Sequence, residues 1–319
     1  MSPGEGMATL VGTIADNVTR VIQGKDDVVG LALVCLLAEG HLLVEDVPGV
    51  GKTSLAKALA TSIAANYGRV QFTPDLLPSD VVGVSVWNRS DERFEFRPGP
   101  VFTNVLVADE INRASPKTQS ALLEAMAEQQ VTVDGRTYPL DPPFLVMATQ
   151  NPVEHEGTYP LPESQLDRFL MRISVGYPDR GAELAMLDAH GDHDALADIS
   201  PVASAADVVA MQQAVRSVHV APSLKGYLVD VADSTRRHPR LALPVSPRAT
   251  LALLWAARAR AAAAGRQYVV PDDIKVLAVP VLAHRLLVTP EAQLGGISPA
   301  DALQEAVRTV AVPAGRGNR

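Results

Sequence analysis

The sequence predicts an α/β fold in which a five-stranded parallel sheet, with helices on both faces and two inserted hairpins, is followed by an all-helical domain. In the first half, strand-like and helix-like segments alternate, which is typical of parallel sheets. After Pro178 the strand patterns stop, and apolar residues recur at helical spacing. We therefore expect an α/β domain over residues 1–177 and a helical domain over residues 178–319, with a frayed tail from Ala314.

The expected strands are short apolar or β-branched runs, a pattern typical of strands covered on both faces. In chain order they are residues 41–47, 69–73, 104–108, 144–149 and 169–175. Between the first two strands, Leu55, Leu59 and Ile63 recur every four residues, which predicts a helix over residues 54–67.

Two insertions interrupt this alternation of strands and helices. Residues 82–97 alternate apolar and polar side chains on either side of a polar turn. Residues 130–140 do the same around Asp134-Gly135, a dipeptide that strongly favours a tight hairpin turn. We expect both insertions to project from the sheet as hairpins.

Three helix starts stand out in the second half. Ser204 and Ser246 are favoured N-cap residues, and Pro247 follows the second of them at a position that suits proline. Pro271 begins a further helix, which we expect to kink or end at Pro280.

The composition excludes several classes of protein. Lys and Arg number 28 and Asp and Glu 36, so the net charge of −8 disfavours a general binder of nucleic acid or anionic membranes. The single cysteine, Cys35, excludes an internal disulfide and a thiolate metal cluster.

The apolar run 28–38, which contains Cys35, is far shorter than the ~20 residues of a membrane span and is expected to be a buried helix. Because the first ten residues lack the basic region of a signal peptide, we expect a cytoplasmic protein with no integral membrane segment.

Residues 46–53, DVPGVGKT, lie between a predicted strand and a predicted helix, the context that a phosphate-binding loop requires. Backbone N–H groups there would face the β- and γ-phosphates of a nucleotide, Lys52 would neutralise phosphate charge, and the Thr53 hydroxyl would bind Mg²⁺. Asp46 replaces the usual first glycine and is tolerable only if its carboxylate points away from the phosphates. The alternative is a chance glycine-rich turn. The residues expected at the phosphates are Pro48, Gly49, Val50, Gly51, Lys52, Thr53 and Ser54.

Residues 105–110, VLVADE, form an apolar strand that ends in two acids. Asp109 could hold Mg²⁺ through its water shell, while Glu110 orients and deprotonates the water that attacks the γ-phosphorus. Alone, such a pattern usually marks a strand that leaves the core. Its position some fifty residues after a GKT loop favours the catalytic interpretation.

Asn151 comes at the end of the next predicted strand. A short amide there could contact both the γ-phosphate and the attacking water, because it offers a donor and an acceptor at fixed reach. The alternative is an ordinary Asn-Pro turn with Pro152.

Together with the phosphate loop at residues 46–53, several longer segments resemble the MoxR family of AAA+ ATPases over roughly residues 10–290. The segments are ADEINRA at 108–114, TQNP at 149–152, EGTYPLPESQLDRF at 156–169 and SPRA at 246–249. The resemblance implies the AAA+ P-loop NTPase fold with a helical lid, and ATP/ADP and Mg²⁺ as cofactors. It also implies site roles: Arg168 as arginine finger, Arg248 as second sensor, Asn151 as first sensor, and Val21, Ile22, Gln23 and Gly24 at the adenine.

The position of these arginines agrees with those implied roles. Arg168 directly precedes a predicted strand, so it lies at the rim of the sheet and cannot easily reach its own phosphate loop. Arg248 stands in the first turn of a helix, where the dipole disfavours a cation unless an anion is near. Arg113 is a second candidate interface cation. The alternatives are a surface ion pair for Arg168, with Glu163 or Asp167, and an ordinary helix-start arginine for Arg248.

The expected function is Mg²⁺-dependent ATP hydrolysis in a homo-oligomeric ring, a hexamer, with nucleotide at each subunit interface. The resemblance implies chaperone-like remodelling or maturation of a protein client that carries a von Willebrand A domain. A nucleic-acid-translocating motor is the main alternative, but residues 126–143 carry Glu128, Asp134 and Asp141 against Arg136 alone and would repel phosphates. A scaffold that only binds nucleotide is a third possibility, against which Glu110 argues.

Overall fold

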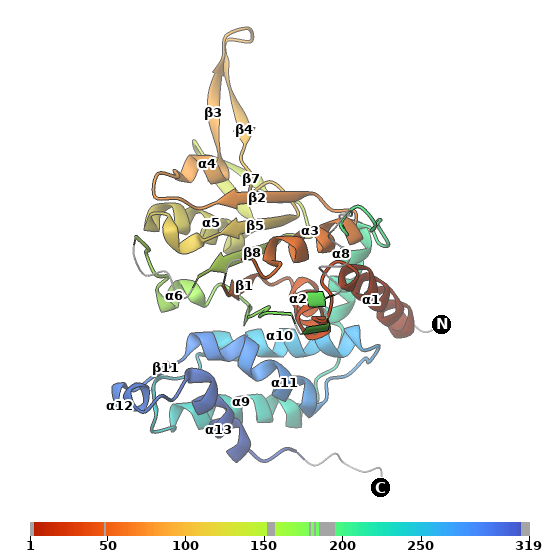
Figure 1. Ribbon diagram of the computed structural model, residues 1–319, viewed down its shortest axis with the longest axis vertical. Coiled ribbons are helices and arrows are strands. Elements are labelled where there is room, and N and C mark those ends of the chain that lie inside the picture. The colour runs from red at the N-terminus through yellow and green to blue at the C-terminus, as the bar shows by residue number, and fades with distance from the viewer. Residues whose placement is uncertain are drawn as a thin grey trace.

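The computed structural model describes residues 3–47, 49–151, 157–178, 180–181, 183–184 and 195–313. Its central sheet has five parallel strands in the order β2-β5-β8-β1-β9 (Figure 1). The strands are β1 (Leu42–Glu45), β2 (Tyr67–Gln71), β5 (Val105–Asp109), β8 (Leu145–Gln150) and β9 (Met171–Ile173). All five strand predictions are confirmed, with bounds that differ by one or two residues at each end. The order places the carboxyl ends of β5, β8 and β1 next to one another.

Helices cover both faces of the sheet, as predicted. Side chains alternate along each strand, so in β1 Leu42 and Val44 enter one apolar cluster while Leu43 enters the other. On the first face lie α1 (Pro3–Thr19), α2 (Asp26–Leu37) and α3 (Lys52–Ser62). On the second face lie α4 (Pro78–Val82), the short helix η1 (Ile111–Arg113), α5 (Pro116–Glu128) and α6 (Glu163–Leu166). Cys35 is buried within α2.

Both insertions are hairpins. β3 (Gly83–Asn88) pairs with β4 (Arg93–Pro98) in an arm that projects from the molecule (Figure 1). β6 (Gln130–Val133) pairs with β7 (Arg136–Pro139). Asp134 and Gly135 have φ values of 50° and 75°, as a type I′ turn requires. The ring of Phe96 stacks on that of Tyr138 with centroids 4.0 Å apart, which ties the base of the arm to the second hairpin.

The second half is helical and lies at the end of the molecule opposite the β3–β4 arm (Figure 1). Between residues 195 and 313 its helices are α8 (Ala205–Arg216), α9 (Pro222–Arg236), α10 (Pro247–Ala263), α11 (Pro271–Leu282), η2 (Ala283–Arg285), α12 (Pro290–Leu294) and α13 (Pro299–Thr309). Ser204 and Ser246 cap α8 and α10, as predicted. The structure adds a short antiparallel pair, β10 (Leu241–Leu243) with β11 (Leu287–Val288), whose strands are too short to leave a sequence pattern.

One expectation about a helix end is wrong. The predicted helix over residues 54–67 ends at Ser62, because Ala64 takes a left-handed φ of 48° and Tyr67 already pairs with β5. Pairing at the sheet edge overrides the helical pattern there. At Pro280, where a kink or an end was expected, α11 continues for two residues to Leu282, and the kink stays a prediction.

The predicted domain boundary at residue 177 stays a prediction. α8 packs against α2, where Gln212 Nε2 donates to the Leu36 carbonyl at 2.8 Å, and one apolar cluster runs from the sheet into α10 and α11. The predicted tail over residues 314–319 lies outside the described residues. In the described part of the chain, every helix is too short or too polar to cross a bilayer.

Candidate active site

The phosphate loop joins β1 to α3 at the carboxyl edge of the sheet. Gly49 and Gly51 have φ values of 87° and 91°, conformations that favour glycine. Gly51 is the N-cap of α3 and makes no side-chain cap, so the first N–H groups of that helix are left for an anion. Thr53 and Ser54 follow Lys52 in this first turn. Pro48 lies outside the described residues.

Lys52 lies between the loop and the acidic strand end. Its Nζ donates to the Asp46 carbonyl at 2.9 Å. Burial lowers the pKa of Lys52, while the charges of Asp46, Asp109 and Glu110 oppose that shift. The fold therefore brings together the loop lysine and both predicted acids. The Asp46 carboxylate itself accepts hydrogen bonds from Val47 and from the segment after β9. It is therefore directed at protein donors, which meets the requirement that it point away from the phosphates.

The stretch expected at the adenine also reaches the loop. Val21, Ile22 and Gly24 follow α1, and a Cβ placed on Gly51 would lie 3.6 Å from Ile22 Cδ1. Ile22 is buried, whereas Val21 is half-buried. This apolar stretch therefore borders the phosphate loop at the start of α3.

Asp109 ends β5 and is held by protein donors on both oxygens. Arg69 Nε donates to its Oδ2 at 2.6 Å, and the Thr149 hydroxyl donates to its Oδ1 at 3.2 Å. Thr149 is the penultimate residue of β8. With both oxygens engaged, Asp109 is suited to hold a cation through bound water rather than directly.

Glu110 follows in a left-handed conformation with φ of 54°. Its N–H donates to the Thr149 hydroxyl at 2.9 Å. Its Oε2 accepts from Gln71 Nε2 at 2.8 Å and from Arg113 Nη1 at 3.1 Å. Arg113, a candidate interface cation in the sequence, thus pairs with the carboxylate of its own chain.

Sequence reasoning missed Arg69, Gln71 and Thr149. Arg69 and Gln71 sit two residues apart on β2, so they face the same side, and Gln71 is in register with Asp109. Arg69 Nη2 also donates to Gln71 Oε1 at 3.0 Å, which links the partners of the two acids. The alternation of side chains along β2 can be read from the sequence, but the strand that pairs with β2 cannot.

Asn151 directly follows β8 and is half-buried. The preceding residue, Gln150, accepts at its carbonyl from the Asp46 N–H at 3.2 Å. The end of β8 is therefore bonded to the beginning of the phosphate loop, as the predicted site requires.

Arg168 contacts α5, and Arg248 contacts Asp167, the residue that directly precedes Arg168. Arg168 Nη1 donates to the Leu123 carbonyl of α5 at 2.5 Å, and it lines a pocket formed by α5, α6 and the start of β6. Arg248 Nε lies 3.6 Å from Oδ2 of Asp167, the residue before Arg168. The buried Arg285 contacts the other oxygen of Asp167 at 3.0 Å.

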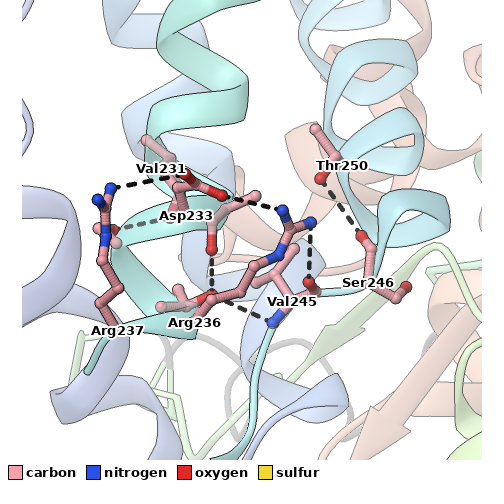
Figure 2. Close-up of polar contacts among 10 residues, drawn as sticks. Val231, Asp233, Arg236, Arg237, Val245, Ser246 and Thr250 are labelled. Atoms are coloured by element: carbon pink, nitrogen blue, oxygen red, sulfur yellow. Dashed lines mark hydrogen bonds and ion pairs between the residues drawn. The ribbon is translucent and has the colours of Figure 1, made fainter. Parts of the chain in front are cut away.

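The start of α10, which carries Arg248, is anchored to the end of α9 (Figure 2). Arg236 pairs with Asp233 at 3.0 Å and donates to the Val245 carbonyl at 3.5 Å. The next residue, Ser246, caps α10 through its hydroxyl. The contacts at the corner between α9 and α10 therefore fix the position of the Arg248 backbone.

Comparison with known proteins agrees with this geometry. The family described as "ATPase family associated with various cellular activities (AAA)" matches residues 41–171, and the family described as "AAA lid domain" matches residues 233–306. The uncharacterized protein YeaC of Bacillus subtilis is 50% identical over 99% of each chain. Chaperone MoxR1 of Mycobacterium tuberculosis is 43% identical over 97% of this chain and 85% of that protein.

A crystal structure extends the agreement to three dimensions. A candidate ATPase from Cytophaga hutchinsonii superposes with a TM-score of 0.90 at 37% identity, over 98% of this chain and 97% of that one. The sheet order described above places the phosphate loop beside the two acids, and the similarity spans nearly the whole sequence. On these grounds the chain is a nucleotide-binding ATPase that belongs to the MoxR family of AAA+ ATPases.

Proposed function

We propose that this ATPase works as a Mg²⁺-dependent hexameric ring in which each nucleotide lies between two subunits. The observation that carries the proposal is the placement of Arg168. It contacts α5 and lines a pocket there, whereas the phosphate loop lies between β1 and α3. A guanidinium on that face is suited to a neighbour's nucleotide, where such a residue contributes about 10³ to 10⁵ in turnover.

Arg248 belongs to the same interface in this proposal. Its contact with Asp167 places it one residue from Arg168 rather than at its own phosphate loop. We infer that both arginines act in trans, on one phosphate chain. Asp167, with Arg248 on one oxygen and Arg285 on the other, would hold the pair in place.

Within each subunit, the roles follow from the donors and acceptors described above. The loop amides and Lys52 bind phosphate, Glu110 orients and deprotonates the attacking water, and Asn151 positions that water against the γ-phosphate. Thr53 and Asp109 would hold Mg²⁺, Asp109 through water because its oxygens are engaged. When bound, Mg²⁺ neutralises charge on the β- and γ-phosphates.

We propose that the work done is chaperone-like remodelling or maturation of a protein client with a von Willebrand A domain. The name of MoxR1, a chaperone, supports the protein client. The β3–β4 arm exposes Trp87 and Phe94 at 49% and 66%, side chains suited to an apolar protein surface. The β6–β7 hairpin and its flanks, residues 126–143, carry Glu128, Asp134 and Asp141 against Arg136 alone, which argues against a nucleic-acid motor.

Mixing two inactive variants tests the shared site. Arg168→Ala should lose turnover by about 10³-fold or more because the finger is gone, while its nucleotide affinity stays near that of the wild type. Lys52→Ala should lose nucleotide binding. In mixed rings, Arg168 of a Lys52→Ala subunit can serve the intact loop of an Arg168→Ala subunit, so part of the phosphate release returns.

The matched control is Arg89→Ala, an exposed arginine on the β3–β4 turn, which should leave turnover unchanged. Mass measurement verifies that mixed assemblies form. An absence of recovery at every mixing ratio, in assemblies shown to contain both variants, would rule out the shared site.

A further inference from the structure

Asp46 stands where the usual phosphate loop has its first glycine, and its carboxylate is fully engaged elsewhere. Oδ2 accepts from the Gly176 N–H at 2.6 Å and from the Ser174 hydroxyl at 2.9 Å. Oδ1 accepts from the Val47 N–H at 2.9 Å. Burial alone would raise the pKa of Asp46, but these hydrogen bonds outweigh it and hold the pKa below 3.8. The residue is therefore a carboxylate at neutral pH and is only 8% exposed.

The backbone of Asp46 is equally engaged. Its carbonyl accepts from Lys52 Nζ at 2.9 Å, and its N–H donates to the carbonyl of Gln150, the residue before Asn151. One residue thus joins three parts of the site: the loop lysine, the end of β8, and the segment 174–176 that leaves β9.

Segment 174–177 is the path by which the chain leaves the sheet toward the helical half. It is held a second time by Lys25 Nζ, which donates to the Tyr177 carbonyl at 2.6 Å. Lys25 directly follows the stretch expected at the adenine. The two ends of a bound nucleotide would therefore lie near Asp46 and Lys25, the two residues that hydrogen-bond to segment 174–177.

We propose that Asp46 is a positioning residue that couples the phosphate loop to the segment 174–176, so that nucleotide in the loop rigidifies the chain's exit from the sheet. The proposal rests on the nucleotide site described above. An ammonium has three donors, so Lys52 can keep the Asp46 carbonyl while it binds phosphate. Ordering of the loop by nucleotide then reaches Ser174 and Gly176 through a single side chain.

The direction in which ADP affinity changes in Asp46 variants distinguishes a positioning role from a purely electrostatic one. If Asp46 acted only as a negative charge near the phosphates, Asp46→Asn would bind ADP more tightly, since one repulsive charge is removed. If Asp46 positions the loop, Asp46→Asn and Asp46→Ala both bind ADP more weakly. Because charge-assisted hydrogen bonds are lost, we expect about a tenfold to hundredfold weaker affinity for Asp46→Ala and an intermediate loss for Asp46→Asn.

Two measurements on the full chain decide it. Fluorescence titration with N-methylanthraniloyl-ADP gives the affinity, and amide hydrogen exchange of a peptide containing Gly176 reports the coupling. In the wild type, ADP should slow exchange at Gly176. In Asp46→Ala, exchange should be faster and should no longer respond to ADP, whereas Ser174→Ala, which keeps the Gly176 bond, should retain most of the response.

Asp207→Asn is the matched control, because Asp207 also accepts from a serine hydroxyl and a backbone N–H, at the start of α8. It should leave ADP affinity and Gly176 exchange unchanged. Affinity equal to or tighter than the wild type in both Asp46 variants, or Gly176 exchange that ADP does not change in the wild type, would overturn the proposal. A wild type that does not bind ADP would instead refute the nucleotide site itself.

Discussion

Glu110 shows how single residues in this site are held in costly conformations. A non-glycine residue in the left-handed region costs roughly 1–2 kcal/mol, yet Glu110 adopts a φ of 54°. The hydrogen bond from its N–H to Thr149 offsets part of that cost, and Gln71 and Arg113 fix its carboxylate. The backbone turn thus separates the direction of Glu110 from that of the adjacent Asp109, which lets two neighbouring acids serve different purposes.

The role of Glu110 as general base predicts a selective loss of function. Glu110→Gln keeps the shape and the Oε1 acceptor but cannot take a proton, so hydrolysis should fall by about 10² to 10⁴-fold while ATP still binds. Phosphate release and nucleotide titration measure the two effects separately. Glu291→Gln, an exposed residue of α12, is the control. Turnover of Glu110→Gln equal to that of the wild type would remove Glu110 from this role.

Among the elements, α5 and the sheet are joined by a buried histidine. His41 precedes β1, and its Nδ1 accepts from the Val146 N–H of β8 at 3.1 Å while its Nε2 faces the Met126 carbonyl of α5 at 3.1 Å. A neutral ring with the proton on Nε2 satisfies both contacts. Protonation of Nδ1 would break the bond to Val146. Burial accordingly lowers the pKa of His41 from 6.5 to about 4.

This lowered pKa predicts that stability falls in mild acid. The unfolded chain takes up a proton near pH 6.5 and the folded chain only near pH 4, so the free energy of unfolding decreases as the pH falls between these values. For His41 alone we expect a loss of about 2 kcal/mol between pH 7 and pH 5. Urea denaturation of the wild type and of His41→Asn, which keeps an acceptor for Val146, measures the difference.

Another buried histidine, His284, is present in both the wild type and His41→Asn. Burial lowers its pKa to about 3, so it adds the same slope to each. The wild type should therefore lose more stability than His41→Asn over this range. Identical pH slopes for the two proteins would contradict the assignment of His41 as a buried neutral group.

At the scale of the whole molecule, the helical half carries residues that act on the sheet half. His284 and Arg285 of η2 both contact the Phe169 carbonyl, at 3.2 and 2.8 Å, and Arg285 also contacts Asp167. Burial lowers the pKa of Arg285 to about 10, so it remains a cation at neutral pH. The two neighbours of Arg168 are thus held by the helical half, and a movement of that half would shift the proposed finger.

Ring assembly predicts a mass that depends on nucleotide. With ATP and Mg²⁺, Glu110→Gln should hold unhydrolysed nucleotide at its interfaces and shift toward a hexamer in light scattering or native mass spectrometry. Lys52→Ala, which lacks the phosphate lysine, should not respond to ATP. A mass that stays monomeric at high concentration with ATP and Mg²⁺ would refute the ring.

The sequence alone determined the five buried strands, both hairpins, the helix caps and the phosphate loop, because these depend on local spacing and on residue types within a few positions of one another. It also indicated the family, through motifs that are contiguous in the chain. Only the tertiary structure decided the strand order, and with it that Arg69 and Gln71 of β2 meet Asp109 and Glu110. Likewise, the Asp46 carboxylate contacts Ser174, which is 128 positions away in the chain. Arg248 contacts Asp167, which is 81 positions away and in a different element. Such contacts depend on which elements pack together, and no local pattern of side chains records that choice.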